Sequence, residues 1–325
     1  MPRQKPTTFR DILQQLHDER AALTPRLLSR LSSLPQTDLA AFAETWVDTH
    51  AERRRDIARR MVDLAEEDYK LDFDVLFRYM FNDDDAMVRA AGIEGLWESE
   101  DATLVKPLVG FLRSDPDARV RSAAADALGR FVLLGEYGRL PERYVDLICE
   151  ALLATTRSIS EDIDVRCRAV EAIAYWSNDI VREVIDRAYE DDVLEMRASA
   201  VAAMGHTADT FWREITEAEL ESPDAQMRFQ AARATGELEN RQATPRLIEL
   251  LDDESREVQG AAILALGQVG GAAAKNALTQ AAQSDDEILR VLASEALEEL
   301  TFASDADFLL LDLDSAPDDK EENEE

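Results

Sequence analysis

The side chains best suited to catalysis or metal binding are few in this chain and lie far apart. The three histidines, in separate segments, are His17, His50 and His206. Cys149 and Cys167 are too few for a disulfide framework or a four-thiolate metal site. Carboxylate pairs are uninformative because the chain has 68 acidic residues. We therefore expect no catalytic residue, no metal and no cofactor.

Regularly spaced arginines form the one conspicuous pattern. In this pattern an arginine follows an apolar residue. Small residues stand three and six positions after the arginine, and an aliphatic residue stands seven positions after it, as in Arg121, Ala124, Ala127 and Leu128. These anchor arginines are Arg89, Arg121, Arg166, Arg197, Arg228 and Arg290, with Gln259 as a variant. The aspartates found four residues before an anchor are Asp85, Asp117, Asp162, Asp224 and Asp286.

Two interpretations fit this arrangement. The arginines could form a row of anion-binding sites, or they could pair with the acidic turns four to six residues upstream. We favour the second, an internal Asp–Arg ladder that ties successive repeats together, because charge-assisted pairs with guanidinium groups are strong and directional.

The anchor spacing identifies the elements that carry these residues. Anchors 197, 228, 259 and 290 are each 31 residues apart, which indicates a tandem repeat. The position directly before an anchor and the positions three, six and seven residues after it fall on one face of a helix. A second apolar segment precedes each motif, as in residues 244–251, where Pro245 suits a first helical turn. Each repeat is therefore predicted to be a helical hairpin, and the fold to be all-α.

Residues 115–129, Asp-Pro-Asp-Ala-Arg-Val-Arg-Ser-Ala-Ala-Ala-Asp-Ala-Leu-Gly, resemble the HEAT-like repeat of the phycobilin-lyase type, and the likeness extends over residues 83–300. The resemblance implies a right-handed α–α superhelix, a HEAT/armadillo-like solenoid. It also implies that the arginine-bearing second helices line the concave side. The family includes chromophore lyases, iron hydroxylases and many scaffolds, so it does not choose among these functions.

The sequence divides into three parts. Residues 1–80 lack the motif and are predicted to be a helical N-terminal cap, residues 81–302 an array of about seven repeats, and residues 303–325 an acidic, mostly disordered tail. Within the tail, the apolar segment 308–313 either folds back or binds another protein. An insertion near 131–145 is either a projecting loop or a helix extension. The recurring Gly205, Gly236 and Gly267 indicate helix ends.

The net charge of −32 disfavours direct binding to nucleic acid or to anionic membranes. No secretion signal or membrane span is expected, and the sparse cysteines fit a cytoplasmic location. Within residues 1–60, a basic cluster could be a solvated helix face or a docking site; it comprises Arg53, Arg54, Arg55, Arg59 and Arg60.

The positions one, two and five after each anchor are expected to face the concave groove. We predict a partner-binding surface there, made of Glu94, Asp126, Glu171, Arg233, Leu264 and Glu295. Such a groove suits another protein with a basic or amphipathic helical segment. The sequence thus favours a non-enzymatic interaction scaffold. The alternative is a bilin or tetrapyrrole lyase, or a lyase-accessory chaperone, of the phycobilin-lyase type.

Overall fold

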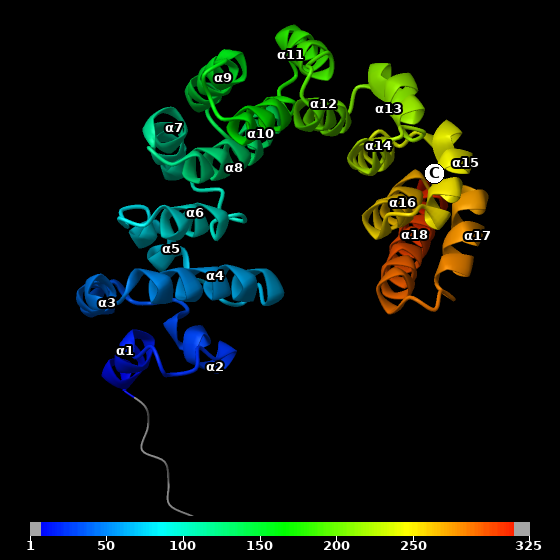
Figure 1. The fold of residues 1–325 in the computed structure, drawn as a ribbon. Coiled ribbons are helices and arrows are strands. Elements are labelled where there is room, and N and C mark those ends of the chain that lie inside the picture. The colour runs from blue at the N-terminus through cyan, green and yellow to red at the C-terminus, as the bar shows by residue number, and fades with distance from the viewer. Residues whose placement is uncertain (1–7, 315–325) are drawn as a thin grey trace, which may run out of the picture. The chain divides into compact units, whose positions relative to one another are not determined.

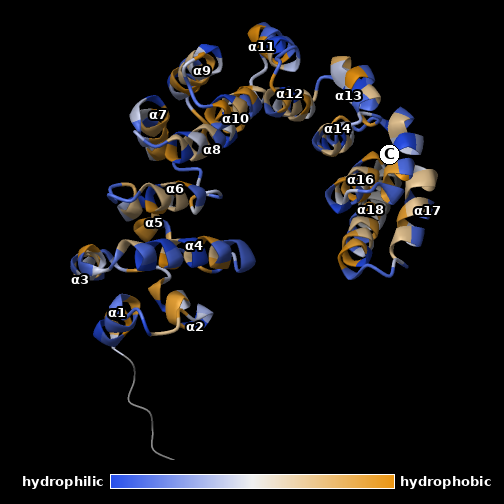
Figure 2. Cartoon of the chain, in the orientation of Figure 1, coloured by the Kyte–Doolittle hydropathy of each residue, from blue (hydrophilic) through white to orange (hydrophobic). Residues whose placement is uncertain are grey.

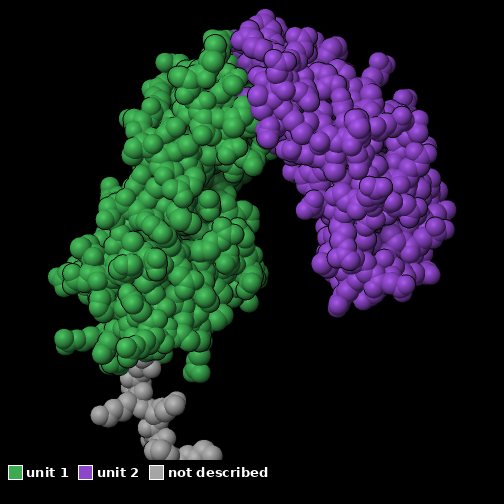
Figure 3. All heavy atoms as spheres, in the orientation of Figure 1, with its two compact units in different colours: residues 1–178 green, residues 179–325 purple. Residues whose placement is uncertain are grey.

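The computed structural model describes residues 8–314, with side chains through Thr301. Helices joined by turns make up this part of the chain, which contains no strand (Figure 1). In Figure 2 the helices carry hydrophobic and hydrophilic residues on the same ribbon, as the periodicity predicts. The predicted all-α repeat fold is confirmed. The chain separates into two compact units, residues 1–178 (unit 1) and 179–325 (unit 2) (Figure 3).

Unit 1 begins with short helices and continues as helix pairs. Its α-helices are α1 (Phe9–His17), α2 (Pro25–Leu28), α3 (Gln36–Asp48), α4 (Ala51–Glu67), α5 (Asp74–Met80), α6 (Ala86–Glu94), α7 (Val105–Ser114), α8 (Ala118–Glu136), α9 (Glu142–Arg157) and α10 (Ile163–Ile173). Two 3₁₀ turns, η1 (Ser29–Leu31) and η2 (Ala102–Leu104), connect them. Helices α4, α6, α8 and α10 pack side by side as a layer, and α5, α7 and α9 pack on α6, α8 and α10 respectively.

Unit 2 repeats this arrangement. Its α-helices are α11 (Asp179–Tyr189), α12 (Leu194–His206), α13 (Arg213–Glu219), α14 (Ala225–Glu237), α15 (Thr244–Glu249), α16 (Arg256–Val269), α17 (Gly271–Ala281) and α18 (Glu287–Asp314). The 3₁₀ turns are η3 (Thr210–Trp212), η4 (Arg241–Ala243) and η5 (Leu250–Asp252). Helices α12, α14, α16 and α18 form one layer, on which the odd-numbered helices pack. Every anchor of the sequence motif lies on an even-numbered helix, hereafter a second helix.

The small-residue stripe forms the interior of the repeats. The residues three after an anchor are all fully buried from α8 onward: Ala124, Ala169, Ala200, Ala231, Ala262 and Ala293. A methyl group at this position fills the space between neighbouring helices without pushing them apart, which gives the close packing that protein interiors require. Leucine, valine and methionine from the flanking helices complete the core.

The recurring glycines mark the last turns of second helices and have a second role. Gly205 and Gly236 are each followed by one more residue before α12 and α14 end. A Cβ on Gly236 would lie 2.9 Å from the Cα of Ala265 on α16, and one on Gly205 would lie 2.7 Å from the Cα of Ala234 on α14. These glycines therefore also allow neighbouring second helices to approach closely.

The insertion near residues 131–145 consists mainly of extended helix. Helix α8 has 19 residues and α9 has 16, which leaves only residues 137–141 as a connection. At the other end, α18 continues through residue 302, where the tail was predicted to begin, and ends at Asp314. The side chains of segment 308–313 and all of residues 315–325 lie outside the described residues, so the predictions for them are untested.

Candidate functional site

The anchor side chains link the turns of successive repeats. Arg89 donates two hydrogen bonds to the carboxylate of Asp115, of 2.9 and 2.8 Å, and Arg228 donates two to Asp253, of 2.7 and 2.9 Å. Arg121 binds Glu161 in the same way, at 2.7 Å. In each case the acid belongs to the turn of the following repeat. Arg89, Arg121 and Arg228 thus tie neighbouring repeats.

A second bond recurs within six of the repeats. The anchor side chain donates to the backbone carbonyl six residues upstream, in the turn between the first and second helices. The anchors that make this bond are Arg89, Arg121, Arg197, Arg228, Gln259 and Arg290. Gln259 shows that a neutral amide suffices for this contact, at 2.6 Å from the carbonyl oxygen of Asp253. Arg166 occupies the anchor position in α10.

The aspartates predicted as members of the ladder cap the second helices. The N-cap carboxylates that accept backbone N–H groups of the first turn belong to Asp85, Asp117, Asp162 and Asp224. Asp286 likewise accepts the amide of Ile288. A carboxylate at this position satisfies helix amides that have no other partner. The acids that bind Arg89 and Arg121 are instead Asp115 and Glu161, two residues and one residue before a capping aspartate.

Some capping aspartates also bind arginines from other positions. Asp85 accepts from Arg55 of α4, and this contact lowers the pKa of the Asp85 carboxyl. Asp117 binds Arg119, which lowers the pKa of Asp117 to about 2. Asp286 pairs with Arg256 at 2.8 Å.

Arg54 holds the anchor position of α4, which the sequence pattern did not reveal. It lies four residues after the N-cap His50, and Ile57 and Met61 are fully buried three and seven residues later. The nearly buried Arg54 side chain donates to the carbonyl of Thr49 and binds Asp83 and Asp84 of the next turn.

The other arginines of the basic cluster also have partners. Arg55 binds Asp85, and Arg53 donates to the carbonyls of Leu16 and Ala21. Arg59 and Arg60 form exposed pairs with Asp63 and Asp56.

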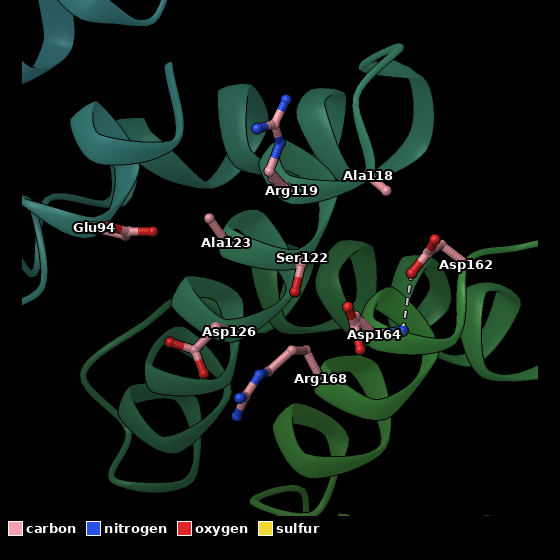
Figure 4. A pocket seen from close by; sticks show the side chains of 9 residues that line it. All are labelled: Glu94, Ala118, Arg119, Ser122, Ala123, Asp126, Asp162, Asp164 and Arg168. Carbon is pink, nitrogen blue, oxygen red and sulfur yellow. Dashed lines mark hydrogen bonds between the residues drawn. The ribbon is translucent and has the colours of Figure 1, made fainter. Parts of the chain in front are cut away.

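A hollow on the second-helix layer of unit 1 is acidic. It encloses about 590 Å³ and is lined by Glu94, Ala118, Arg119, Ser122, Ala123, Asp126, Asp162, Asp164 and Arg168, from α6, α8, α10 and the turn before α10 (Figure 4). Four of these residues are acidic and two are basic. Both arginines already bind acids outside the hollow: Arg119 pairs with Asp117 and Arg168 with Glu171. We call this set of nine residues the acidic hollow.

Two of the predicted partner-binding residues line the acidic hollow together, and a third supports it. Glu94 ends α6 and Asp126 lies on α8, while Glu171 holds Arg168 at 2.6 Å. Arg168, two residues after an anchor, occupies a position expected to face the groove. Arg119 and Asp164 were not predicted: each lies two residues before an anchor, where the motif specifies no residue type.

The other three predicted residues belong to unit 2. Arg233 lies 3.7 Å from Glu237 and over the ring of Phe229. Leu264 is about half exposed on α16, and Glu295 is exposed on α18. These residues thus line a different surface from the acidic hollow.

Glu94 carries an electrostatic cost in the folded state. The Glu94 side chain is 46% exposed, but partial desolvation beside the neighbouring helices raises its pKa, and the charges of Asp126 and Glu66 raise it further, against the opposing effect of Arg59, 3.9 Å away. A carboxyl whose pKa is raised on folding favours the folded state below its unfolded pKa of about 4.3, and this contribution is lost as pH rises through the folded pKa. The charged form at neutral pH therefore lowers stability.

Replacing Glu94 with glutamine is accordingly expected to stabilise unit 1 at pH 7. The advantage over the wild type should shrink as the pH falls through the raised pKa and should vanish below about pH 4. Urea unfolding midpoints at pH 7 and pH 4 measure the difference. Glu98→Gln, an exposed neighbour, is the control. Equal midpoints for Glu94→Gln and wild type at pH 7 would contradict the assigned cost.

The cysteines and histidines do not assemble a reactive centre in the described part of the chain. Both cysteines are buried, and burial raises the pKa of the Cys149 thiol to about 12. His206 lies 3.8 Å from Glu237. Among residues 8–301, no group of three or more His, Cys, Asp or Glu side chains is placed to hold a metal ion. The described helices also include none that is both long and apolar enough to cross a membrane.

Solved structures share the fold at low sequence identity. The CpcE–CpcF complex of phycocyanin lyase from Nostoc sp. has a TM-score of 0.51 and 15% identity, covering 87% of this chain and 97% of the other. Escherichia coli YibA gives 0.41 at 18% identity, covering 78% and 98% of the respective chains. Human deoxyhypusine hydroxylase gives 0.37 at 18% identity, covering 90% and 96%. At sequence identities this low, the similarity shows a shared fold alone.

No curated protein sequence matches the chain significantly. The family model for HEAT repeats matches residues 73–159 and 214–298, more than half of the chain. Those ranges include five of the seven predicted repeat anchors. This match and the paired helices agree with the resemblance seen in the sequence, and the chain belongs to the HEAT-repeat family.

Proposed function

We propose that the chain is a non-enzymatic scaffold of the cytoplasm that binds a basic helical segment of another protein at the acidic hollow. The observation that carries the proposal is the convergence of Glu94, Asp126, Asp162 and Asp164 on one hollow whose two arginines are already paired with acids. A cationic partner would gain Coulomb attraction there and relieve the repulsion between Glu94 and Asp126.

The spacing of the second helices supports a helical partner. Packed helices lie about 8–10 Å apart, so acids on α6, α8 and α10 recur at that interval. Basic side chains seven residues apart on an α-helix are separated by about 10.5 Å, at about 1.5 Å per residue. A helix with lysine or arginine at every seventh position would therefore meet successive acids.

Neutralising the hollow is expected to weaken binding at least tenfold. The variant Glu94→Gln, Asp126→Asn, Asp164→Asn removes three charges and leaves the capping Asp162 in place. A partner is first isolated by affinity purification from the native host and then purified, and its affinity is measured by calorimetry. The matched control is Glu142→Gln, Asp146→Asn, Glu150→Gln, which removes three exposed charges from α9.

The control separates a local site from the general effect of the −32 charge. The affinity of the control variant should stay within about twofold of the wild type, because surface charges distant from the site are screened at about 0.15 M salt. Equal losses in both triple variants would attribute the attraction to net charge alone. An unchanged affinity in the hollow variant would reject this surface as the binding site.

A bilin or tetrapyrrole lyase function is the second candidate, supported by the fold shared with the CpcE–CpcF complex of phycocyanin lyase. The charge of the hollow opposes it, since the propionate groups of a tetrapyrrole would face four carboxylates. Titration of the protein with a free bilin decides between the two. A saturable shift of the bilin absorption band would favour the lyase, and an unchanged spectrum would favour the scaffold.

A further inference from the structure

Unit 2 carries an exposed apolar strip on two adjacent second helices. Ile288 and Val291 lie one turn apart on α18, with exposed fractions of 64% and 49%, and Leu264 on the neighbouring α16 is 48% exposed. Between them, Gly260 has no side chain, and a Cβ at that position would lie 3.6 Å from Cδ1 of Leu292. Leu264, Ile288, Val291 and Leu292, with Gly260, are hereafter the apolar strip.

The repeat register shows that this strip is a departure from the pattern. The positions of Ile288, Val291 and Leu292 are occupied in α8 by Arg119, Ser122 and Ala123, which line the acidic hollow. The position of Leu264 is occupied by Asp126 in α8 and by Arg233 in α14. The same repeat positions thus carry polar or small residues in α8 and large aliphatic residues in α16 and α18.

Leaving these side chains in water has a free-energy cost. Each exposed Å² of apolar surface contributes about 25 cal/mol when it is buried by a partner. On α18 the residues at positions 288, 291, 292 and 295 follow the spacing i, i+3, i+4 and i+7, so they share one helix face. A helix laid along this face could bury leucine-sized side chains beside Gly260, where the surface has no side chain to fill the space.

The charges beside the strip define the partner further. Glu257 on α16 and Glu287 and Glu295 on α18 are exposed at its edges, whereas Arg256 is held by Asp286. An apolar strip with acidic edges complements a helix that has a leucine-rich face and basic flanks. We propose that the apolar strip binds the apolar face of an amphipathic, basic-flanked helix of another protein. This site is separate from the acidic hollow and depends on apolar contact.

The test uses the full chain and a defined probe. The probe is a fluorescein-labelled 18-residue peptide of leucine and lysine, with leucines at i, i+3, i+4 and i+7; a permuted peptide of the same composition has no leucine face. Fluorescence anisotropy in about 0.3 M NaCl measures binding to wild type, to Ile288→Ser/Val291→Ser and to Leu264→Ser. Val193→Ser, an exposed aliphatic site elsewhere in unit 2, is the control.

We expect the double variant to bind the probe at least tenfold more weakly than wild type, Leu264→Ser about threefold more weakly, and Val193→Ser equally well. The effect should persist in the background of Glu94→Gln, Asp126→Asn, Asp164→Asn, which isolates it from the acidic hollow. Equal binding of the permuted peptide, or loss of the effect in that background, would overturn the proposal. So would a wild-type dimer in sedimentation velocity that the double variant abolishes, because the strip would then bind a second copy.

Discussion

Replacing Arg228 with methionine is expected to destabilise the α14–α16 region by about 3 kcal/mol. Methionine keeps most of the side-chain volume but removes the two hydrogen bonds to Asp253 and the bond to the carbonyl of Ser222. The Asp253 side chain is only 7% exposed, so its carboxylate would lose its counter-charge where water cannot fully replace it.

Hydrogen exchange of the amides in α14 and α16 measures this loss locally, which matters because repeat arrays do not always unfold in one step. Arg228→Gln is the informative comparison. Gln259 shows that an amide side chain can still reach the upstream carbonyl, so Arg228→Gln should lose less stability than Arg228→Met. Equal losses would mean that the carbonyl bond contributes nothing.

The same pair makes a prediction about pH. The hydrogen bonds from Arg228 lower the pKa of Asp253. A carboxyl with a lowered pKa stabilises the fold above its unfolded value of about 3.9, and this contribution is lost as pH falls through the folded pKa. A double-mutant cycle of Arg228→Met and Asp253→Asn should therefore show coupling at pH 7 that declines in acid. A coupling independent of pH would show that the ionised carboxylate is not responsible.

Replacing Gly236 with alanine is expected to cost about 2 kcal/mol, although alanine is the better helix former. The new methyl group would lie 2.9 Å from the Cα of Ala265 and in collision with the side chain of Gln268. Gln268 is exposed and can move, but the backbone of α16 can yield only if α14 and α16 separate. Chemical denaturation and hydrogen exchange of α16 measure the effect.

Gly110→Ala provides the opposite result within the same chain. Gly110 lies inside α7, and a Cβ there would meet nothing within 4 Å. Removing the glycine from an exposed helix interior should stabilise unit 1 by about 0.5–1 kcal/mol. If both glycine variants were stabilising, the close approach of α14 and α16 would not restrict the residue at position 236.

The fold could be predicted because its determinants are local. The stripe that leads from Arg121 through Ala124 to Leu128 specifies a helix face within eight residues, and the 31-residue period specifies how such faces stack. Arg54 was not recognised as an anchor because Arg53 and Arg60 occupy the positions where the motif has an apolar and a small residue. Its partner, Asp83, lies 29 residues away.

The candidate site could be predicted only in part. Glu94 and Asp126 follow from counting five residues beyond an anchor, and the structure places them in one hollow. The acids that pair with the anchor arginines could not be predicted. Asp115 and Asp117 are the same residue type in the same turn, so residue type does not show which of them binds an arginine. Only the helix start distinguishes them: the aspartate adjacent to the first turn must cap it, and the other is left for Arg89.

The anchor contacts also bear on how the array changed length during evolution. Arg228 needs only a carbonyl six residues behind it and a carboxylate 25 residues ahead, and both lie within residues 222–253. A tandem duplication of residues 223–253 would therefore supply every new arginine with its acceptor at once, without compensating substitutions elsewhere. Gene duplication in whole 31-residue steps is thus a permitted route for this chain. The bond from Arg121 to Glu161, 40 residues ahead, shows that a longer repeat also keeps the contact when the added residues extend α8 and α9.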